Sequence, residues 1–219
     1  MSRANPDTVG IAILAKAPEP GRVKTRLAMM LGVDGAARLH ERLATHTVKA
    51  AVEAATGPIT IWAAPDERHP FFQELAQQFP VALARQPEGD LGARMHAAFA
   101  HAGEAMLVIG TDCPVLNATH LRDAADVLRG GLDAVIFAAE DGGYVLIGLS
   151  RPVPELFTDM AWSSDGVMVE TRQRLRHLGL SWREPGQLWD VDRPSDVRRM
   201  GREGLSELLA GIDKRAKAE

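Results

Sequence analysis

The stretch Val9-Gly-Ile-Ala-Ile-Leu-Ala15, followed by Lys16-Ala-Pro-Glu-Pro-Gly-Arg-Val-Lys-Thr-Arg-Leu27, decides the fold class. Its first seven residues form a short, continuously apolar run, which predicts a buried β-strand. The twelve residues that follow carry four cations against one acid: Lys16, Arg22, Lys24, Arg26 and Glu19. Because α/β proteins bind phosphates in loops at the carboxyl ends of buried strands, this stretch predicts a site for a polyanion such as a nucleotide.

Short apolar runs alternate with helical stretches along the rest of the chain, which predicts an α/β fold. Strands are expected at 59–63, 81–84, 105–109, 134–139 and 144–149, with one or two more within 181–191. Helices are expected at 35–55, 71–79, 91–102, 120–128 and 167–178, before a charged helical region at the C-terminus. Continuously apolar strands indicate a mostly parallel sheet covered on both faces, so the expected architecture is a three-layer sandwich in one domain.

The composition is that of an ordinary soluble globular protein, with 219 residues, 46% hydrophobic and 25% charged. The net charge of −4 and the local clustering of basic residues argue against a nucleic-acid partner. No apolar run approaches the roughly 18–20 residues that span a membrane, and residues 1–8 lack a signal-peptide core. The lone cysteine, Cys113, excludes an internal disulfide. We therefore expect a cytoplasmic protein without a membrane partner.

Three carboxylates follow predicted strands. Asp112 lies in Gly110-Thr-Asp-Cys-Pro114, and the other two form Asp190-Val-Asp192. A carboxylate held rigidly at a strand end suits a hard divalent cation that carries phosphate oxygens, although turn and helix-cap chemistry explains an isolated Asp equally well. Together the three predict a clamp for Mg²⁺ or Mn²⁺, with no His/Cys cluster at zinc spacing to compete for a metal.

Three further loops join predicted elements. Gly89-Asp-Leu-Gly92 opens a helix that carries Arg94, and it is expected beside a base or a phosphate. Asp141-Gly-Gly-Tyr144 offers backbone amides and an aromatic ring, or simply a hairpin turn. Trp162-Ser-Ser-Asp165 is either an acceptor loop or a capped helix start. Cys113 is expected to be a packing residue. The seven histidines fall mostly on predicted helix surfaces or loops, and none has a partner that suggests catalysis.

Six motifs occur in one order: Lys16-Ala-Pro-x-Pro-Gly-x-Val-Lys-Thr-Arg-Leu27, Gly89-Asp-Leu-Gly-x-Arg-Met95, Gly110-Thr-Asp-x-Pro114, Asp141-Gly-Gly-Tyr-x-Leu-Ile-Gly148, Trp162-Ser-Ser164 and Asp190-Val-Asp192. This series resembles a bacterial family of small glycosyltransferase-like proteins, related to 2-phospholactate guanylyltransferase and associated with radical-SAM proteins. The resemblance runs from about residue 9 to residue 197. Ser164 departs from the family's usual Thr but keeps the hydroxyl.

The resemblance implies the GT-A (nucleotide-diphospho-sugar transferase) fold, with a nucleotide-binding half at about 9–115, an acceptor half at about 116–200 and a C-terminal helix at 201–219. It implies Mg²⁺ or Mn²⁺ held by Asp112 and completed by Asp192, with Asp190 beside them. The residues expected at the nucleotide are Lys16, Ala17, Gly21, Lys24, Arg26, Gly89, Asp90 and Gly92. Those expected at the acceptor are Gly142, Gly143, Tyr144, Trp162, Ser163 and Ser164. The expected catalytic residues are Asp112, Lys24 and Asp141, the last as the base that orients an acceptor hydroxyl.

Three functions remain open at this point. The family label implies a metal-dependent glycosyltransferase that takes an NDP-sugar donor and a small-molecule acceptor. The Lys-Thr-Arg loop resembles nucleotidyltransferases, which join an NTP to a phosphorylated small molecule and release pyrophosphate; both reactions stabilise charge on a leaving phosphate. A non-catalytic nucleotide sensor is the third hypothesis, and the three carboxylates together count against it. The sequence gives no sign of an oligomeric state.

Overall fold

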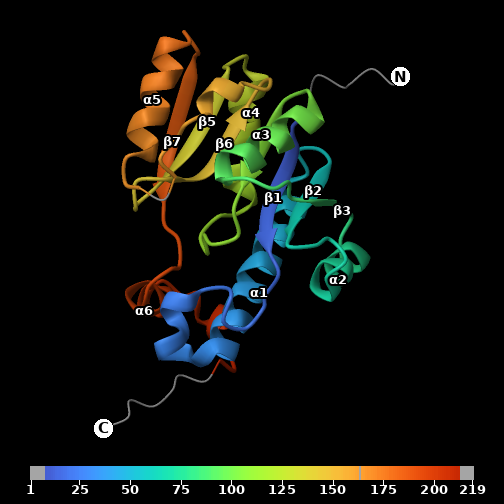
Figure 1. Ribbon diagram of the computed structural model, residues 1–219, viewed down its shortest axis with the longest axis vertical. Helices are drawn as coiled ribbons and strands as arrows, with labels where there is room; N and C mark the ends of the chain where they lie inside the picture. The colour runs from blue at the N-terminus through green and yellow to red at the C-terminus, as the bar shows by residue number, and fades with distance from the viewer. Residues whose placement is uncertain (1–7, 163, 213–219) are drawn as a thin grey trace.

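The computed structural model describes residues 8–162 and 164–212. Their centre is a seven-stranded sheet with the order β3-β2-β1-β4-β6-β5-β7 (Figure 1). The strands are β1 Gly10–Lys16, β2 Ile59–Ala64, β3 Ala82–Arg85, β4 Met106–Ile109, β5 Ala134–Ala139, β6 Tyr144–Leu149 and β7 Trp182–Leu188. β6 runs antiparallel to β4 and β5, and the remaining pairs are parallel. The predicted mostly parallel, mixed sheet is confirmed.

Helices cover both faces of the sheet, as a three-layer sandwich requires. They are α1 Ala28–Ala54, α2 Pro70–Gln78, α3 Leu91–Ala102, α4 Ala118–Arg129, α5 Val167–His177 and α6 Pro194–Arg202, with short 3₁₀ turns η1 Thr25–Leu27, η2 Pro154–Leu156 and η3 Ser206–Leu209. Apolar residues of α1, α2 and α4 pack in one cluster against the sheet, and those of α3 and α5 pack in a second cluster against its other side. Asn117 caps α4 through its side chain, as the sequence predicts.

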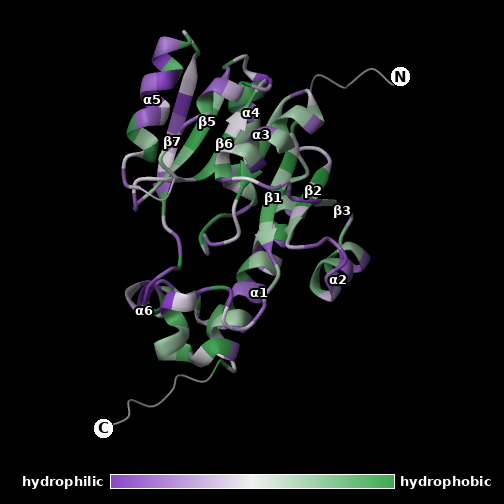
Figure 2. Cartoon of the chain, in the orientation of Figure 1, coloured by the Kyte–Doolittle hydropathy of each residue, from purple (hydrophilic) through white to green (hydrophobic). Residues whose placement is uncertain are grey.

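The strand residues alternate between these two clusters. In β1, Ile11 and Ile13 contribute to the first cluster and Ala12 to the second, and all three are fully buried. Figure 2 shows the consequence, with hydrophobic strands in the centre and hydrophilic positions on the outer helices such as α5. Burial on both sides explains why the strand sequences are continuously apolar.

A third apolar cluster, which we call the terminal core, joins η1 and the first part of α1 to the C-terminal segment of the described chain. It comprises Leu27, Leu31, Ala36, Leu39, Leu43, Trp189, Val191, Val197, Met200 and Ile212. In Figure 1 the early part of α1 and the segment around α6 accordingly lie together at the end of the molecule away from β7 and α5. The loop between β1 and α1 is thereby packed against the segment that follows β7.

Two helix predictions need correction. The helix expected from residue 35 begins at Ala28, because a break at Gly32 (φ 72°) lets an earlier turn pack in the terminal core. The helix expected over 201–219 is in fact the end of α6 followed by the short turn η3, because Gly204 takes a left-handed conformation (φ 79°) that ends the helix. Residues 213–219 lie outside the described part. No described helix combines the length and apolarity needed to cross a membrane.

The topology gathers the predicted polar motifs at one edge of the sheet. The chain runs from β1 outward through β2 to β3 and then returns to β4 on the other side of β1. The loops after β1 and β4 therefore flank a topological switch point, where open α/β sheets bind ligands. The loops after β5 and β7 end at the same edge because both strands run in the same direction as β1.

Candidate functional site

Lys24 and Asp112 form a tight ion pair at the switch point. The Lys24 ammonium lies 2.6 Å from Asp112 Oδ1, and the Lys24 side chain is only 3% exposed. Burial raises the pKa of Asp112, but the Lys24 charge and the neighbouring His40 lower it more, so it stays well below its usual range. Oδ1 is enclosed, whereas the whole Asp112 side chain is 48% exposed. Oδ2 therefore remains available to a ligand.

Lys24 also joins two segments that are far apart in the sequence. Its ammonium donates to the Val191 carbonyl at 2.6 Å, and the Val191 amide donates to the Asp112 carbonyl at 2.9 Å. The Lys24 backbone adopts a left-handed conformation, φ 47° and ψ 40°, which is costly for a residue with a side chain. This strained turn directs the ammonium inward. Lys24, which the sequence predicts to bind the nucleotide, is therefore held by protein groups and is not exposed to solvent.

His40 is buried beside Asp112, although the sequence analysis finds no partner that suggests catalysis for any histidine. It is 4% exposed, and its Nε2 lies 3.0 Å from the Lys16 carbonyl, which can only accept a hydrogen bond. Nε2 therefore donates, and Nδ1 points toward Asp112 Oδ1 at 3.7 Å. The sequence hides this role because His40 sits on α1 among residues of helical periodicity.

Asp190 lies among like charges. Burial and, after it, the charges of Asp112, Asp141 and Asp192 together raise the pKa of Asp190 to about 7, with Lys24 opposing the rise. The structure thus brings four predicted carboxylates near one another, and their excess negative charge favours a cation.

Asp192 is paired differently from Asp112. Its Oδ2 forms an ion pair with Arg26, and both side chains are well exposed, 46% and 66% respectively. Its backbone amide donates to Asp196 at 3.0 Å, which fixes the start of α6. Lys24 and Arg26 are the cations predicted to bind the phosphates. Each of them forms an ion pair with a carboxylate that is predicted to bind the metal.

The carboxylates fit a metal that is shared with a substrate. Among the residues in 8–162 and 164–212, no three of His, Cys, Asp and Glu are placed to hold a metal ion by themselves. Mg²⁺ needs no such cage, since it is usually bound by one or two carboxylates together with substrate phosphates and water. The open Oδ2 of Asp112 and the carboxyl of Asp190 fit this role, since they supply the one or two carboxylates that such a metal needs from the protein.

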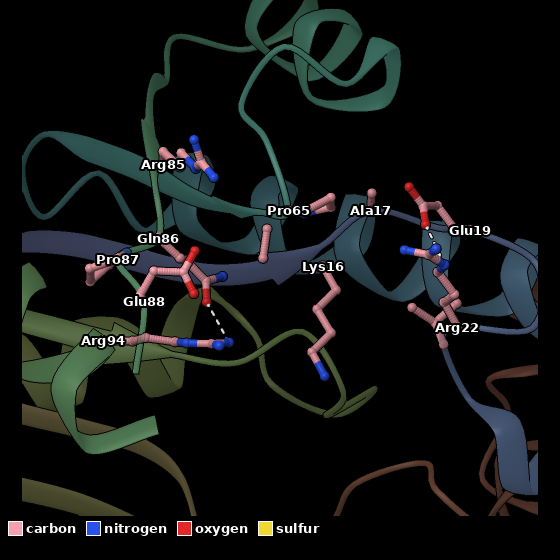
Figure 3. Close-up of a pocket in the computed structure, with 12 residues that line it drawn as sticks. Lys16, Ala17, Glu19, Arg22, Pro65, Arg85, Gln86, Pro87, Glu88 and Arg94 are labelled. Carbon is pink, nitrogen blue, oxygen red and sulfur yellow. Dashed lines mark hydrogen bonds and ion pairs between the residues drawn. The ribbon is translucent and has the colours of Figure 1, made fainter. Parts of the chain in front are cut away.

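A cleft of about 340 Å³ opens beside this cluster, at the carboxyl ends of β1, β2 and β3 (Figure 3). Its lining is mostly polar and strongly charged: Lys16, Ala17, Glu19, Arg22, Val23, Ala64, Pro65, Arg85, Gln86, Pro87, Glu88 and Arg94. Lys16 links the cleft to the carboxylates, because its carbonyl accepts from His40, which faces Asp112. Four cations against two acids make the cleft suitable for an anionic ligand.

Gln86 is the buried polar residue that organises the far side of the cleft, and the sequence analysis missed it. Its amide nitrogen donates to the carbonyls of Ala15 and Trp62 at 3.0 and 2.7 Å, and its oxygen accepts from Arg94 at 3.3 Å. Both amide hydrogens are thus used, so the oxygen must face Arg94. The signal in the sequence is a polar residue directly after a strand, the same signal that identified Asp112.

The Gly89–Gly92 loop has clear structural duties. Asp90 caps α3 by accepting from the Ala93 amide at 2.8 Å, and Gly89 takes φ 116° just before it. A Cβ on Gly92 would overlap the Phe157 carbonyl and the Trp162 indole. Of the residues around this loop, it is Glu88 and Arg94 that line the cleft. Ligand contact by Asp90, Gly89 or Gly92 stays a prediction.

The loop between β5 and β6 places Asp141 near the carboxylate cluster. Asp141 Oδ1 accepts from the Gly143 amide at 3.1 Å, which closes a tight turn. Gly142 takes φ 95° and packs directly on the backbone of Asp165, where a Cβ would not fit. The turn therefore requires a glycine at Gly142, and the predicted contact of Gly142 and Gly143 with an acceptor is untested.

Tyr144 and Trp162 form an aromatic pair at the same edge. Their rings meet edge to face, with centroids 6.4 Å apart, and the Tyr144 hydroxyl donates to Met95 Sδ at 3.8 Å. Burial raises the pKa of Tyr144 far above its ordinary value. Ser164 donates to the Ala161 carbonyl at 2.8 Å, and Ser163 lies outside the described residues.

Arg199 of α6 connects the cluster to this loop. Its guanidinium pairs with both oxygens of Glu140, at 2.7 and 3.1 Å, and lies 4.3 Å from the ring centroid of Trp189. Glu140 and Trp189 directly precede Asp141 and Asp190. Arg199 therefore fixes the two segments that carry these carboxylates.

A protein-family model described as an uncharacterized protein conserved in bacteria (DUF2064) matches residues 47–164. The chain belongs to this family. The matched part contains β2 to β6 and so includes Gln86, Asp112 and Asp141. The curated proteins include no match to the chain.

Solved structures of nucleotide-utilising transferases share the fold. A provisionally assigned nucleotide-diphospho-sugar transferase from Desulfovibrio desulfuricans G20 has 27% identity and a TM-score of 0.78, over 92% of this chain and 96% of the other. A nucleotidyl transferase from Methanothermobacter has 18% identity and a TM-score of 0.58, covering 91% and 99%. A 4-diphosphocytidyl-2C-methyl-D-erythritol synthase from Anaerococcus prevotii has 10% identity and a TM-score of 0.58, covering 91% and 97%. The expected nucleotide-diphospho-sugar transferase fold is confirmed.

Proposed function

We propose that this protein is a metal-dependent glycosyltransferase that transfers a sugar from a nucleotide-diphosphate donor to a small-molecule acceptor. The observation that carries the proposal is the adjacency of a cationic cleft and a carboxylate cluster at the switch point of the sheet, joined through Lys16, His40 and Asp112. The similarity to the Desulfovibrio protein, over nearly the full length of both chains, supports a sugar nucleotide as the donor.

The cleft would take the nucleotide. Lys16 and Arg94 reach it from β1 and α3, and their charges would bind phosphate and the polar edge of the nucleoside.

Asp112 and Asp190 would hold Mg²⁺ or Mn²⁺, with Asp192 next to them. When bound, the metal ion neutralises charge that develops on the diphosphate as it leaves. Lys24 keeps Asp112 ionised and fixed in orientation, since it holds Oδ1 and leaves Oδ2 open. Asp141 would accept a proton from, or orient, the acceptor hydroxyl at the neighbouring loop, beside Tyr144 and Trp162.

Nucleotidyl transfer is the second candidate. It is favoured by the number of cations around the cleft, since Lys16, Arg22, Arg85 and Arg94 together could bind the longer polyphosphate chain of an NTP. The relation to 2-phospholactate guanylyltransferase that the motifs suggest belongs to this candidate.

The test is a panel of NDP-sugars and NTPs with and without Mn²⁺, read by thermal shift and by mass spectrometry of the products. We expect one NDP-sugar to stabilise the protein in the presence of Mn²⁺ and to release NDP slowly. Asp112→Asn should abolish this turnover, and Asp126→Asn, a surface carboxylate of α4, should not. Pyrophosphate released from an NTP in the presence of phosphorylated acceptors would favour the second candidate. Absence of any nucleotide binding would refute both.

A further inference from the structure

We propose that Arg26 pairs with Asp192 in the free protein, where it screens Asp192 from metal. When the substrate binds, Arg26 releases Asp192 and pairs with a phosphate group of the substrate. This inference rests on the proposed function, because it concerns how the same site receives its metal and its polyphosphate ligand. Its basis is the difference between the two ion pairs that join the cationic loop to the carboxylate segments.

The ion pair between Lys24 and Asp112 is expected to persist when a ligand binds. The ammonium is buried, and it is held by two oxygens, Asp112 Oδ1 and the Val191 carbonyl. Moving it would leave a buried carboxylate oxygen and a carbonyl without a donor, which is costly. The backbone bond from Val191 to Asp112 reinforces the same arrangement.

The Arg26 pair is built to open. Arg26 is 66% exposed and Asp192 is 46% exposed, and the described structure gives the Arg26 side chain no other hydrogen-bond partner. Exposed ion pairs contribute little to stability, so a competing anion can remove the guanidinium easily. Arg26 lies in η1, two residues from Lys24, so it belongs to the same loop as the lysine that holds Asp112.

The charge balance gives the exchange its direction. In the free protein Arg26 neutralises one member of a crowded acidic cluster that also contains Asp112, Asp141 and Asp190. A divalent cation would replace that neutralisation, and the phosphate would offer two oxygens to the planar guanidinium of Arg26. Metal alone must compete with Arg26, whereas metal that arrives with phosphate gains Arg26 as a partner. Metal and polyphosphate should therefore bind together more readily than metal alone.

The experiment titrates two probes by calorimetry, Mn²⁺ alone and the preformed complex of Mn²⁺ with inorganic pyrophosphate. The variants are Arg26→Met and Arg26→Gln, with Arg172→Met of α5 as the control. Arg172 also pairs with an acid, but that acid is Glu184 of β7, and neither residue belongs to the carboxylate cluster or lines the cleft. Circular dichroism confirms that each variant is folded.

Opposite changes for the two probes are expected. Both Arg26 variants should bind Mn²⁺ alone up to about fivefold more tightly than the wild type, because they lack the exposed cation that competes with the metal. They should bind the Mn²⁺–pyrophosphate complex about tenfold more weakly, because they cannot form the charge-assisted hydrogen bond from Arg26 to the pyrophosphate. Arg172→Met should leave the affinity for both probes within about twofold.

Two different failures are distinguishable. If the Arg26 variants leave Mn²⁺ affinity unchanged, or shift both probes in the same direction, the partner exchange is wrong and the proposed function stands. If the wild type binds neither Mn²⁺ nor its pyrophosphate complex, the proposed function itself fails, and the exchange with it.

Discussion

Replacing Lys24 by methionine should destabilise the protein by about 2–3 kcal/mol at neutral pH. The ammonium makes two 2.6 Å contacts, with Asp112 Oδ1 and with the Val191 carbonyl. Breaking a fully buried ion pair costs about 3–5 kcal/mol, and the half-exposed Asp112 side chain reduces that figure because water can replace part of the lost interaction. At roughly 3 °C per kcal/mol for a chain of this size, the melting temperature should fall by about 6–9 °C.

The pH dependence of this loss identifies its cause. The Lys24 charge helps to hold the pKa of Asp112 below its ordinary value, so the ion pair stabilises the fold above the unfolded-state pKa of about 3.9. That stability is lost as the pH falls through the folded-state pKa. The gap between wild type and Lys24→Met should therefore be full at pH 7 and should narrow progressively below pH 4.

Urea denaturation in the presence of EDTA, at several pH values, measures both quantities. Arg22→Met serves as the control for loss of a surface cation and should change stability by less than about 0.5 kcal/mol. In a double-mutant cycle, Lys24→Met should cost less in the Asp112→Asn background. A loss that stays constant down to pH 3, or that is additive with Asp112→Asn, would show that the ion pair is not its source.

Three further outcomes are expected. Asp190→Asn should stabilise the metal-free protein more at pH 8 than at pH 5, because a pKa raised to about 7 means that folding must pay for an ionised, crowded carboxylate at the higher pH; calorimetric melting curves in EDTA measure this. Gly142→Ala should be about 2 kcal/mol more destabilising in urea than Gly21→Ala, since both glycines have positive φ but only a Cβ at 142 would overlap the Asp165 backbone; equal losses would contradict the packing argument. Gln86→Leu should cost about 2 kcal/mol in the same assay by removing two buried hydrogen bonds, and it should weaken nucleotide binding in thermal-shift titrations through the released Arg94; unchanged nucleotide affinity would remove Gln86 from the site.

The sheet could be predicted well from the sequence because the physics of its strands is local. Residues 134–139 and 144–149 are apolar throughout and are bounded by turn residues, so length and hydrophobicity determine them. The start of α1 could not be predicted in the same way. Its first turns depend on packing against Trp189 and Val191 in the terminal core, and no local pattern announces a contact between residues so far apart.

The candidate site divides along the same line. Asp112, Asp141 and Asp190 could be placed at one edge of the sheet, because they directly follow predicted strands and parallel strands end together. The inward orientation of Lys24 could not, since it depends on a left-handed backbone and on an acceptor 167 residues away. His40 was missed for a related reason, because the helical pattern around it gives no sign that one helix position faces a strand-end carbonyl.

The terminal core also determines when, during synthesis of the chain, the candidate site can form. The cationic loop leaves the ribosome early, but Lys24 receives its carbonyl partner only 167 residues later. At about 5–20 residues per second, that interval lasts roughly 10–30 s. Throughout it, the nascent chain can pair β1 with β2 while the carboxylates after β7 do not yet exist. A chain that stops before residue 189 would lack Asp190 and Asp192, so the site can assemble only after the segment that follows β7 has been synthesised.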